Sequence, residues 1–271
     1  MVELSRDPVA KALAVMRWLV DEGPRVCGTR QVAAVLSVSP SSAHRILHGL
    51  AAAGLLEAKH DGFCLSAEFY RLAAKATSRS PIQQIAVPIL EAVVAECDET
   101  AALCLYSRRR RAVTFAALCE SSQPLRHVIE PHTWSPLHAG ASGLAILACL
   151  DDDEVRAIAR ATGLPALTED TITDVEELLC ELAPIRKRGY AISRGQRVPG
   201  AVGIAAPVFA ADGEVVGDLV VTIPRSRYRE SRRKQLADLV RRFAALGTQQ
   251  LGGTLAGRPA GTRSSADAAT R

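Results

Sequence analysis

The chain has 271 residues, which is long enough for two domains with separate cores. Apolar residues make up 48% of it, so general disorder is excluded. No stretch approaches the roughly eighteen consecutive apolar residues of a membrane span. The formal net charge of +4 is too small to argue by itself for a nucleic-acid partner. The first residues have neither the basic start nor the apolar segment of a signal peptide, so we expect a cytoplasmic protein.

The seven cysteines are scattered through the chain, and no two of them form a C-x-x-C pair. An odd number without paired spacing is not typical of a disulfide framework or a zinc site. We therefore expect them to be small buried apolar side chains in a reducing compartment, and we expect neither a metal ion nor a cofactor.

The first predicted helix runs from Pro8 to Asp21 and begins at Asp7, whose carboxylate can accept from the free N–H groups of the first turn. The pair Gly23-Pro24 ends it. Its apolar positions follow helical spacing, so we expect one face to be buried: Val9, Ala12, Leu13, Met16, Leu19 and Val20.

Two further helices are predicted between residues 29 and 53, joined by a tight turn at residues 37–39. Thr29 is the predicted N-cap of the first, and Ser39 that of the second, with Pro40 at the first helical position. The second helix is predicted to bury a stripe at i, i+3, i+4, i+7 spacing, formed by Ala43, Ile46, Leu47 and Leu50. Its other face carries hydroxyl, imidazole and guanidinium groups: Ser41, Ser42, His44, Arg45 and His48.

A short helix with an apolar back and a polar front is what recognition of the DNA major groove requires. The alternative is an ordinary helical hairpin whose polar face is only solvated. Two short β-rich runs around His60-Asp61-Gly62 favour recognition, because Asp-Gly is a strong hairpin signal and three helices followed by a hairpin make a winged helix-turn-helix. We predict a domain over residues 1–66 that binds double-stranded DNA through Arg30, Ser39, Ser41, Ser42, His44, Arg45, Lys59 and His60.

A linker helix is predicted over residues 67–81, and a second domain over residues 82–251. That domain begins with a helix to residue 97. Two β-rich runs, 100–106 and 112–118, then flank four consecutive arginines. Short runs of like charge usually face water, so residues 107–111 are predicted to form a solvated hairpin turn, in preference to a second nucleic-acid contact. A third strand is predicted at residues 127–129.

Residues 135–143 form a loop of small residues that leads into a helix starting at residue 144. The free N–H groups at such a helix start suit a carboxylate. The same stretch also allows the hypothesis of an enzyme, with Ser142 as nucleophile and His138 as its base. A nucleophile elbow needs glycines two residues before and two after the serine, and position 144 is leucine. We therefore do not expect an enzyme.

The remaining predicted elements complete a fold of the α+β class. Helices are predicted over residues 151–161, from a capping box at Thr173 to about residue 188, and over residues 229–251. Strands are predicted at residues 190–193, 202–209 and 214–223, the last two joined as a hairpin. The composition of residues 252–271 cannot form a core, so this tail is predicted to be disordered.

Four segments carry a family resemblance: SPSSAHRILHGL at residues 39–50, PLHAGASGLAILA at residues 136–148, and the strand regions at residues 186–209 and 212–227. In this order they resemble the IclR family of bacterial transcription regulators over almost the whole chain. The resemblance implies a winged helix-turn-helix domain, a linker helix and a GAF-like α/β effector domain. It also implies homodimers or homotetramers and a small organic effector that alters operator binding, for which a carboxylate is one candidate.

Carried over from the family, the effector pocket is lined by Ala141, Ser142, Ser193, Ala201, Gly203, Val220 and Thr222. The chain departs from the family pattern at Leu144, Gln196 and Asp218, the last standing where a small apolar residue is usual. By strand alternation Asp218 shares a face with Val220 and Thr222. One hypothesis is a polar pocket with Asp218 at its rim and Arg194 or Arg197 nearby. The alternative is that Asp218 lies at the solvent end of the strand.

Two other readings of the second domain stay open at this point. In one, it is an enzyme that turns over the metabolite it binds. The failed elbow spacing and the lack of clustered metal ligands argue against that reading. In the other, its pocket is vestigial and the domain serves only for assembly. The small-residue loop at residues 140–143 argues against this hypothesis.

Overall fold

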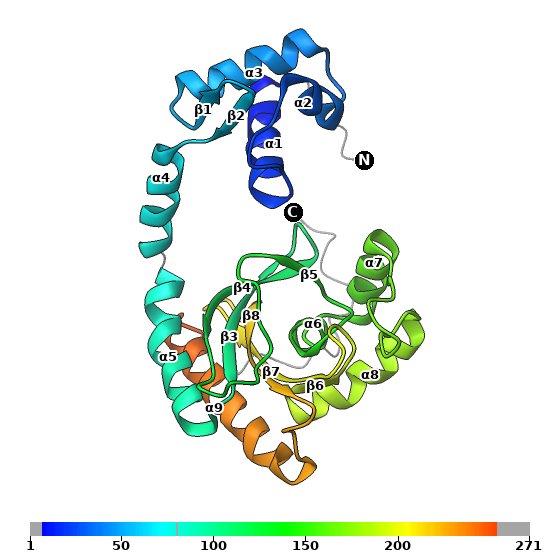
Figure 1. Ribbon diagram of the computed structural model, residues 1–271. Coiled ribbons are helices and arrows are strands. Elements are labelled where there is room, and N and C mark those ends of the chain that lie inside the picture. The colour runs from blue at the N-terminus through cyan, green and yellow to red at the C-terminus, as the bar shows by residue number, and fades with distance from the viewer. Residues whose placement is uncertain (1–6, 80, 254–271) are drawn as a thin grey trace, which may run out of the picture. The chain divides into compact units, whose positions relative to one another are not determined.

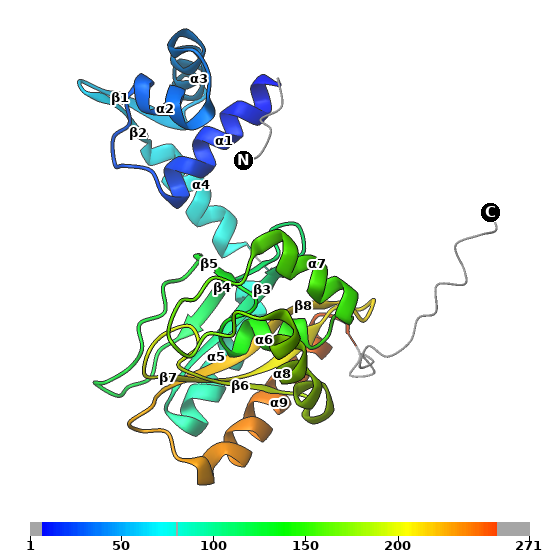
Figure 2. The same cartoon turned by 90° about the vertical axis from the view of Figure 1, so that its right-hand side faces the viewer.

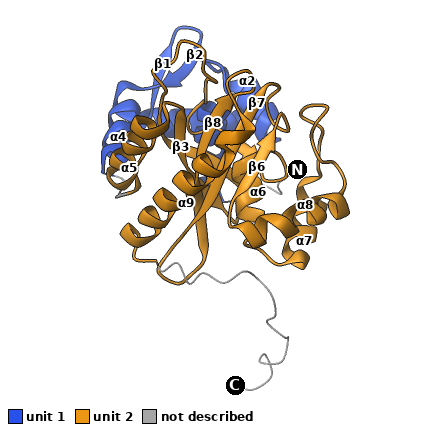
Figure 3. Ribbon diagram, turned by 90° about the horizontal axis from the view of Figure 1, so that it is seen from below, with its two compact units in different colours: residues 1–80 blue, residues 81–271 orange. Residues whose placement is uncertain are grey.

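The computed structural model describes residues 7–79 and 81–253. The chain divides into two compact units, residues 1–80 and residues 81–271, which Figure 3 shows in different colours. Of the tail predicted to be disordered, residues 254–271 lie outside the described residues. No helix among the described residues is long and apolar enough to cross a membrane.

The first unit is a bundle of helices with a two-stranded hairpin (Figures 1 and 2). Its elements are α1 (Pro8–Asp21), α2 (Thr29–Leu36), α3 (Pro40–Ala52), β1 (Leu56–Lys59), β2 (Gly62–Leu65) and α4 (Ala67–Ser78). Helices α1, α2 and α3 share one apolar core with the hairpin, centred on Val15, Val32 and Leu47. Figure 2 shows the hairpin projecting beyond these helices.

Two of the three predicted helix caps in this unit are confirmed. The Asp7 carboxylate accepts from the Val9 N–H at 3.0 Å, and the Ser39 hydroxyl accepts from the Ser42 N–H at 3.3 Å. The predicted cap at Thr29 is wrong, because α2 already includes Thr29 and its N-cap is Gly28. The Gln31 side chain accepts from the Gly28 N–H at 2.8 Å. A side chain within α2 therefore bonds the N-cap residue, in place of the hydroxyl predicted at Thr29.

The predicted inward face of α1 is only partly right. Val15, Met16 and Leu19 are buried, whereas Val9, Leu13 and Val20 are each more than half exposed. The apolar residues of α1 extend around more than one side of the helix, and α2 and α3 cover only one side. The outer residues therefore form an exposed apolar stripe.

The second unit is a six-stranded antiparallel sheet between two layers of helices. The strand order is β5-β4-β3-β8-β7-β6. The strands are β3 (Thr100–Ser107), β4 (Ala112–Cys119), β5 (Trp134–Pro136), β6 (Ala191–Arg194), β7 (Ala201–Phe209) and β8 (Val215–Pro224). The helices are α5 (Pro81–Cys97), α6 (Ala141–Leu147), α7 (Asp152–Thr162), α8 (Val175–Arg188) and α9 (Arg233–Gln250), with a short 3₁₀ turn at Glu230–Arg232.

Each face of the sheet has its own core. Helices α5 and α9 pack on one face and α6, α7 and α8 on the other, as Figure 3 shows. Strand β8 serves both cores, since Leu219, Val221 and Ile223 belong to the α5–α9 core and Val220 to the α6 core.

Several sequence expectations in this unit are corrected. Residues 127–129 form no strand. The third strand is instead β5, which follows these residues in the chain and pairs with β4. The N-cap of α8 is Asp174, not Thr173: its carboxylate accepts from the N–H groups of Glu176 and Glu177 at 2.9 Å. A carboxylate is the stronger acceptor, so it takes the role predicted for the neighbouring hydroxyl.

The arginine run forms the predicted turn between β3 and β4. Arg108 pairs with Glu154 at 3.2 Å and with Glu214 at 3.1 Å, and the Arg110 guanidinium lies 4.7 Å from the centre of the Trp134 ring. At least two of these arginines are thus engaged by groups of the same unit.

Candidate functional site

Helix α3 presents a polar surface above an apolar base. Ala43, Leu47 and Leu50 are buried in the core, whereas His44 and Arg45 are exposed. Ser37, in the left-handed region at φ 52°, turns the chain between α2 and α3. This is the geometry of a helix-turn-helix whose second helix is free to enter a groove.

The serines at the start of α3 form a hydroxyl cluster. The Ser39 hydroxyl lies 3.0 Å from those of both Ser41 and Ser42 while it caps the helix. Ser39 therefore serves the helix itself, and the outward hydroxyl of the cluster is that of Ser41, which is exposed whereas Ser42 is half-buried.

His48 joins α3 to the hairpin, a role that the sequence did not reveal. Its ring lies 4.1 Å from that of His44 and meets Phe63 of β2 edge-on at 5.2 Å. The backbone N–H and C=O of Phe63 also pair with those of Cys27, at 2.9 and 2.8 Å. Because Phe63 is the second residue of β2 and pairs with Ala58 next to the turn, these contacts hold the hairpin near its tip against α3 and the segment before α2.

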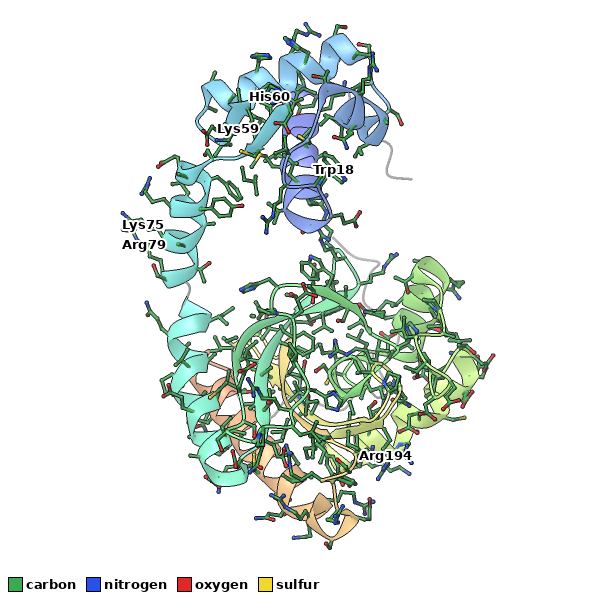
Figure 4. The ribbon with its side chains drawn as sticks, in the orientation of Figure 1. Trp18, Lys59, His60, Lys75, Arg79 and Arg194 are labelled. Atoms are coloured by element: carbon green, nitrogen blue, oxygen red, sulfur yellow. The ribbon has the colours of Figure 1, made fainter. Side chains whose placement is uncertain are left out.

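The tip of the hairpin carries the other predicted DNA contacts, Lys59 and His60, labelled in Figure 4. The Lys59 ammonium donates to the Glu57 carboxylate at 2.6 Å, and this partner raises the pKa of Lys59. The His60 side chain is almost fully exposed. Arg30, on α2, is also exposed. The structure thus places most of the predicted DNA-contacting residues at the surface, but Lys59 has to leave Glu57 to meet a phosphate.

The second unit contains a cavity of about 60 Å³ at the start of α6. It is lined by every residue predicted for the effector pocket: Ala141, Ser142, Ser193, Ala201, Gly203, Val220 and Thr222. Further lining residues come from β4, from β5 and the segment before it, and from the loop between β6 and β7, among them Phe115, His127, Ile129, Ser135 and Arg197.

Small residues allow α6 to lie this close to the sheet. A Cβ on Gly143 would stand 2.1 Å from the carbonyl oxygen of Leu137, and one on Gly203 would stand 3.0 Å from the Cβ of Ala141. Any larger side chain at Gly143 would push the helix away from the backbone of Leu137, which follows β5. The loop of small residues is therefore required by packing, and the cavity lies where α6 meets β7.

Arg197 places a cation in the cavity wall. Its guanidinium donates to the Ser135 hydroxyl at 3.0 Å and lies 4.7 Å from the centre of the Phe115 ring. Burial lowers the pKa of Arg197, although a guanidinium stays charged at neutral pH. No described carboxylate lies within salt-bridge distance of it. Arg194, the other arginine predicted near the pocket, is exposed and pairs with Glu230 at 2.9 Å (Figure 4).

Asp218 is completely buried, with 0% of its surface exposed. It lies within β8, opposite Cys104 of β3 and Pro207 of β7, so the interpretation that placed it at the solvent end of the strand is wrong. It does not line the cavity either, but lies behind Ser142. Burial raises the pKa of Asp218 from 3.8 to about 7, against the opposing effects of Ser142, Cys104 and Arg197.

The mouth of the cavity is covered by the irregular segment between β4 and β5. His127 and Val128 line the cavity, and Val128 is 84% exposed on its outer side. The His127 ring bonds the Gly200 carbonyl at 3.1 Å. Sequence patterns did not reveal this cover, because an irregular segment has no periodicity.

The geometry gives no support to catalysis at Ser142. The ring of His138, its hypothetical base, bonds the Pro165 carbonyl at 3.0 Å, and the Ser142 hydroxyl lies 3.5 Å from the Cys104 thiol. No group of three or more metal-ligating side chains is found among the described residues.

Comparisons with known proteins agree with both units. Residues 8–60 match the family model of the IclR helix-turn-helix domain, and residues 74–246 match that of the bacterial transcriptional regulator IclR C-terminal region. The HTH-type transcriptional regulator BhcR of Paracoccus denitrificans is 32% identical over 212 residues, which cover 78% of this chain and 75% of that protein.

Solved structures show the same architecture. The IclR transcriptional regulator of Alicyclobacillus acidocaldarius superposes with a TM-score of 0.79 at 25% identity, covering 90% of this chain and 98% of that one. An IclR homologue of Microbacterium hydrocarbonoxydans, complexed with 4-hydroxybenzoate, has a TM-score of 0.74 over 90% of this chain and 99% of its own. At 22% identity, that likeness shows the fold alone.

The predicted α+β fold, a winged helix-turn-helix followed by an α/β domain, is confirmed by these matches. The predicted regulatory function is also confirmed, because the relatives named above are transcriptional regulators. The chain belongs to the IclR family of bacterial transcriptional regulators.

Proposed function

We propose that this regulator binds its operator through α3 and the β1–β2 hairpin, and that a small organic carboxylate in the α6 cavity modulates that binding. The observation that carries the proposal is Arg197, a cation in the wall of a small cavity whose other polar groups are hydroxyls and one imidazole, with no described carboxylate beside it. A partly buried guanidinium without an acid partner favours an anionic ligand.

On the DNA side, Ser41, Ser42 and Arg45 are assigned to base edges and adjacent phosphates in the major groove, with His44 beside them. Arg30, Lys59 and His60 are assigned to the sugar–phosphate backbone. The exposure of α3 and the projection of the hairpin support this division. The contribution of Ser39 is the N-cap that holds the start of α3 in place.

On the effector side, Arg197 is assigned to the carboxylate of the ligand, and the hydroxyls of Ser142, Ser193 and Thr222 to its other polar atoms. The cavity volume of about 60 Å³ is well below the roughly 150 Å³ that holds benzene. This supports a short-chain acid over an aromatic one. The Microbacterium homologue binds an aromatic carboxylate, 4-hydroxybenzoate, and so supports the carboxylate class.

We also propose that the protein acts as a homo-oligomer in the cytoplasm. Two-fold assembly places two recognition helices in successive major grooves. The exposed apolar stripe on α1, formed by Val9, Leu13 and Val20, supports assembly because such residues gain by burial against a partner. The domains are assigned as residues 1–66, the linker 67–81, and residues 82–251. No catalytic step is assigned to any of them.

The first test is binding of the purified full chain to the DNA upstream of its own gene, at two salt concentrations with random DNA as competitor. Specific binding is expected, and Arg45→Ala should weaken it by about 1–3 kcal/mol if Arg45 reads a base. An equal loss on random DNA would reassign Arg45 to a phosphate. Equal affinity of the wild-type protein for operator and random DNA would contradict the proposal.

The second test is thermal stabilisation by acetate, propionate, succinate, benzoate and 4-hydroxybenzoate. A ligand that binds only the folded state raises the melting temperature, so the short acids should stabilise the wild-type protein. The matched control is Arg197→Gln, which keeps a polar side chain but removes the charge and should abolish the shift. If no acid stabilises the protein, the result favours the alternative in which the pocket is vestigial and the second domain serves only for assembly.

A further inference from the structure

The carboxyl of Asp218 is completely buried next to the Ser142 hydroxyl and the Cys104 thiol. Neither of its oxygens has a hydrogen-bond partner among the described residues, and the side chain has no contact with solvent. An unpaired charge in such a place is strongly unfavourable, so a protein that keeps a carboxyl there either holds it neutral or uses its charge.

Asp218 is close to the cavity through two neighbours that form its wall. Ser142, at the start of α6, separates the carboxyl from the cavity and itself lines it. Arg197, which also lines the cavity, acts on Asp218 electrostatically and favours its ionised form. The carboxyl and the cavity therefore share one cation.

The other ionisable groups around Asp218 stay uncharged. Cys104 faces it from β3, and burial raises the pKa of that thiol well above 9. Cys149 follows α6, and burial raises the pKa of its thiol to about 12. From β7 the facing residue is Pro207, which does not ionise, and α6 contributes only the Ser142 hydroxyl. Asp218 is thus the group in this cluster that changes its charge near neutral pH.

We propose that Asp218 sets the charge of the effector pocket, and that an anionic effector binds together with one proton that Asp218 takes up from solvent. This inference rests on the proposed carboxylate site. With Asp218 ionised, Arg197 and Asp218 together are neutral and an added anion leaves the pocket with a net negative charge. With Asp218 protonated, the charge of Arg197 is balanced by the effector alone.

The pH dependence follows from this proton balance. Below the pKa of about 7 Asp218 is already neutral in the free protein, and anion binding is independent of its protonation. Above that value one proton has to be bound with each anion. The affinity for a carboxylate should therefore fall by about tenfold for each unit of pH, until the higher pKa of the complex is passed.

Calorimetry on the full chain tests this with acetate and benzoate as probes, at pH values of about 6, 8 and 9 in buffers of different ionisation enthalpy. The expected result is proton uptake by the wild-type protein at the two higher pH values, with affinity falling between them. Asp218→Asn, which cannot ionise, should bind without proton uptake and should exceed the wild-type affinity at the highest pH. Because tighter binding is expected, misfolding cannot mimic this result.

Asp218→Ala is the second variant, in case the amide of the first is poorly accommodated, and it should show the same flat profile. If wild type and both variants bind with the same pH dependence, Asp218 does not control the pocket, and the carboxylate site stands without it. If neither acid binds any of the three proteins at any pH, the proposed carboxylate site and this inference are both overturned.

Discussion

Glu99 and Asp218 are both buried carboxyls of the second unit, with 1% and 0% of their surfaces exposed, but their surroundings are opposite. Glu99 accepts from the Arg227 guanidinium through both oxygens, at 2.9 and 2.5 Å, and Arg232 lies 3.9 Å away. Asp218 has no such partner among the described residues. The paired carboxyl holds parts of the fold together, whereas the unpaired one is sensitive to its charge.

The Glu99 pair fixes a specific part of the fold. Arg227 follows β8, and besides Glu99 it donates to the carbonyl of Leu125 at 2.8 Å. Leu125 belongs to the irregular segment that later covers the cavity. A buried carboxylate with a bidentate guanidinium therefore works as a structural anchor, whereas Arg197, which lines the cavity without a carboxylate at salt-bridge distance among the described residues, is available to a ligand.

The largest expected effect comes from breaking the anchor. Arg227→Ala leaves the Glu99 charge buried with only the distant Arg232, and it should lower the free energy of unfolding by about 3–5 kcal/mol. Urea unfolding at neutral pH measures this. The double variant Glu99→Gln with Arg227→Ala is the control, and it should recover part of the loss because no unpaired charge remains. A single variant as stable as the wild type would show that the pair is not an anchor.

The second effect concerns the unpaired carboxyl. A raised pKa means that folded Asp218 keeps its proton where the unfolded chain has lost it, so the contribution of Asp218 to stability is fully present at acid pH and is lost as pH rises from 3.8 to about 7. The loss contributed by Asp218 is about 4 kcal/mol at most. Asp218→Asn should remove this contribution. The melting temperature of the variant should therefore rise relative to that of the wild type from pH 5 to pH 8. A constant difference would contradict the assignment.

The smallest effect on stability is expected for an exposed pair in the first unit. Glu57 and Lys59 lie 2.6 Å apart on the hairpin, in contact with solvent, where such pairs contribute little. Glu57→Ala should leave the melting temperature unchanged. It should tighten DNA binding and steepen its salt dependence, by up to about one in the logarithmic slope, since it frees Lys59 for a phosphate. Unchanged affinity and slope would place the hairpin tip away from DNA.

The sequence correctly predicted those parts of the molecule that follow local rules of spacing and turn formation. The apolar stripe of α3, with Leu47 and Leu50, and the Asp61-Gly62 hairpin follow local rules, and both are confirmed. The errors at Thr29 and Thr173 have one cause: a neighbouring side chain, Gln31 or Asp174, bonds the first turn better. Local patterns name a helix start but do not decide between adjacent caps.

The cavity was predictable only in part. Its residues on α6, β7 and β8 came from a family resemblance, and the structure brings them together. Phe115 and His127 are far from them along the chain and lie in the cavity wall through tertiary packing alone, whereas Arg197, between Ser193 and Ala201, is one of the two arginines that the sequence hypothesis placed near the pocket. The burial of Asp218 was also beyond a sequence argument, because alternation along β8 gives its face but not whether helices cover that end of the sheet.

The cover formed by His127 and Val128 has a consequence for how quickly the cavity can exchange its contents. The hydrogen bond from the His127 ring to the Gly200 carbonyl ties this segment to the loop between β6 and β7, and Ile129 anchors it in the core, whereas Val128 adds little buried surface. Opening this segment leaves every strand pairing of the sheet intact. Opening of a cover of this kind takes from microseconds to seconds, so the contacts of His127 and Ile129 add to those of a bound molecule in setting how quickly the cavity exchanges its contents.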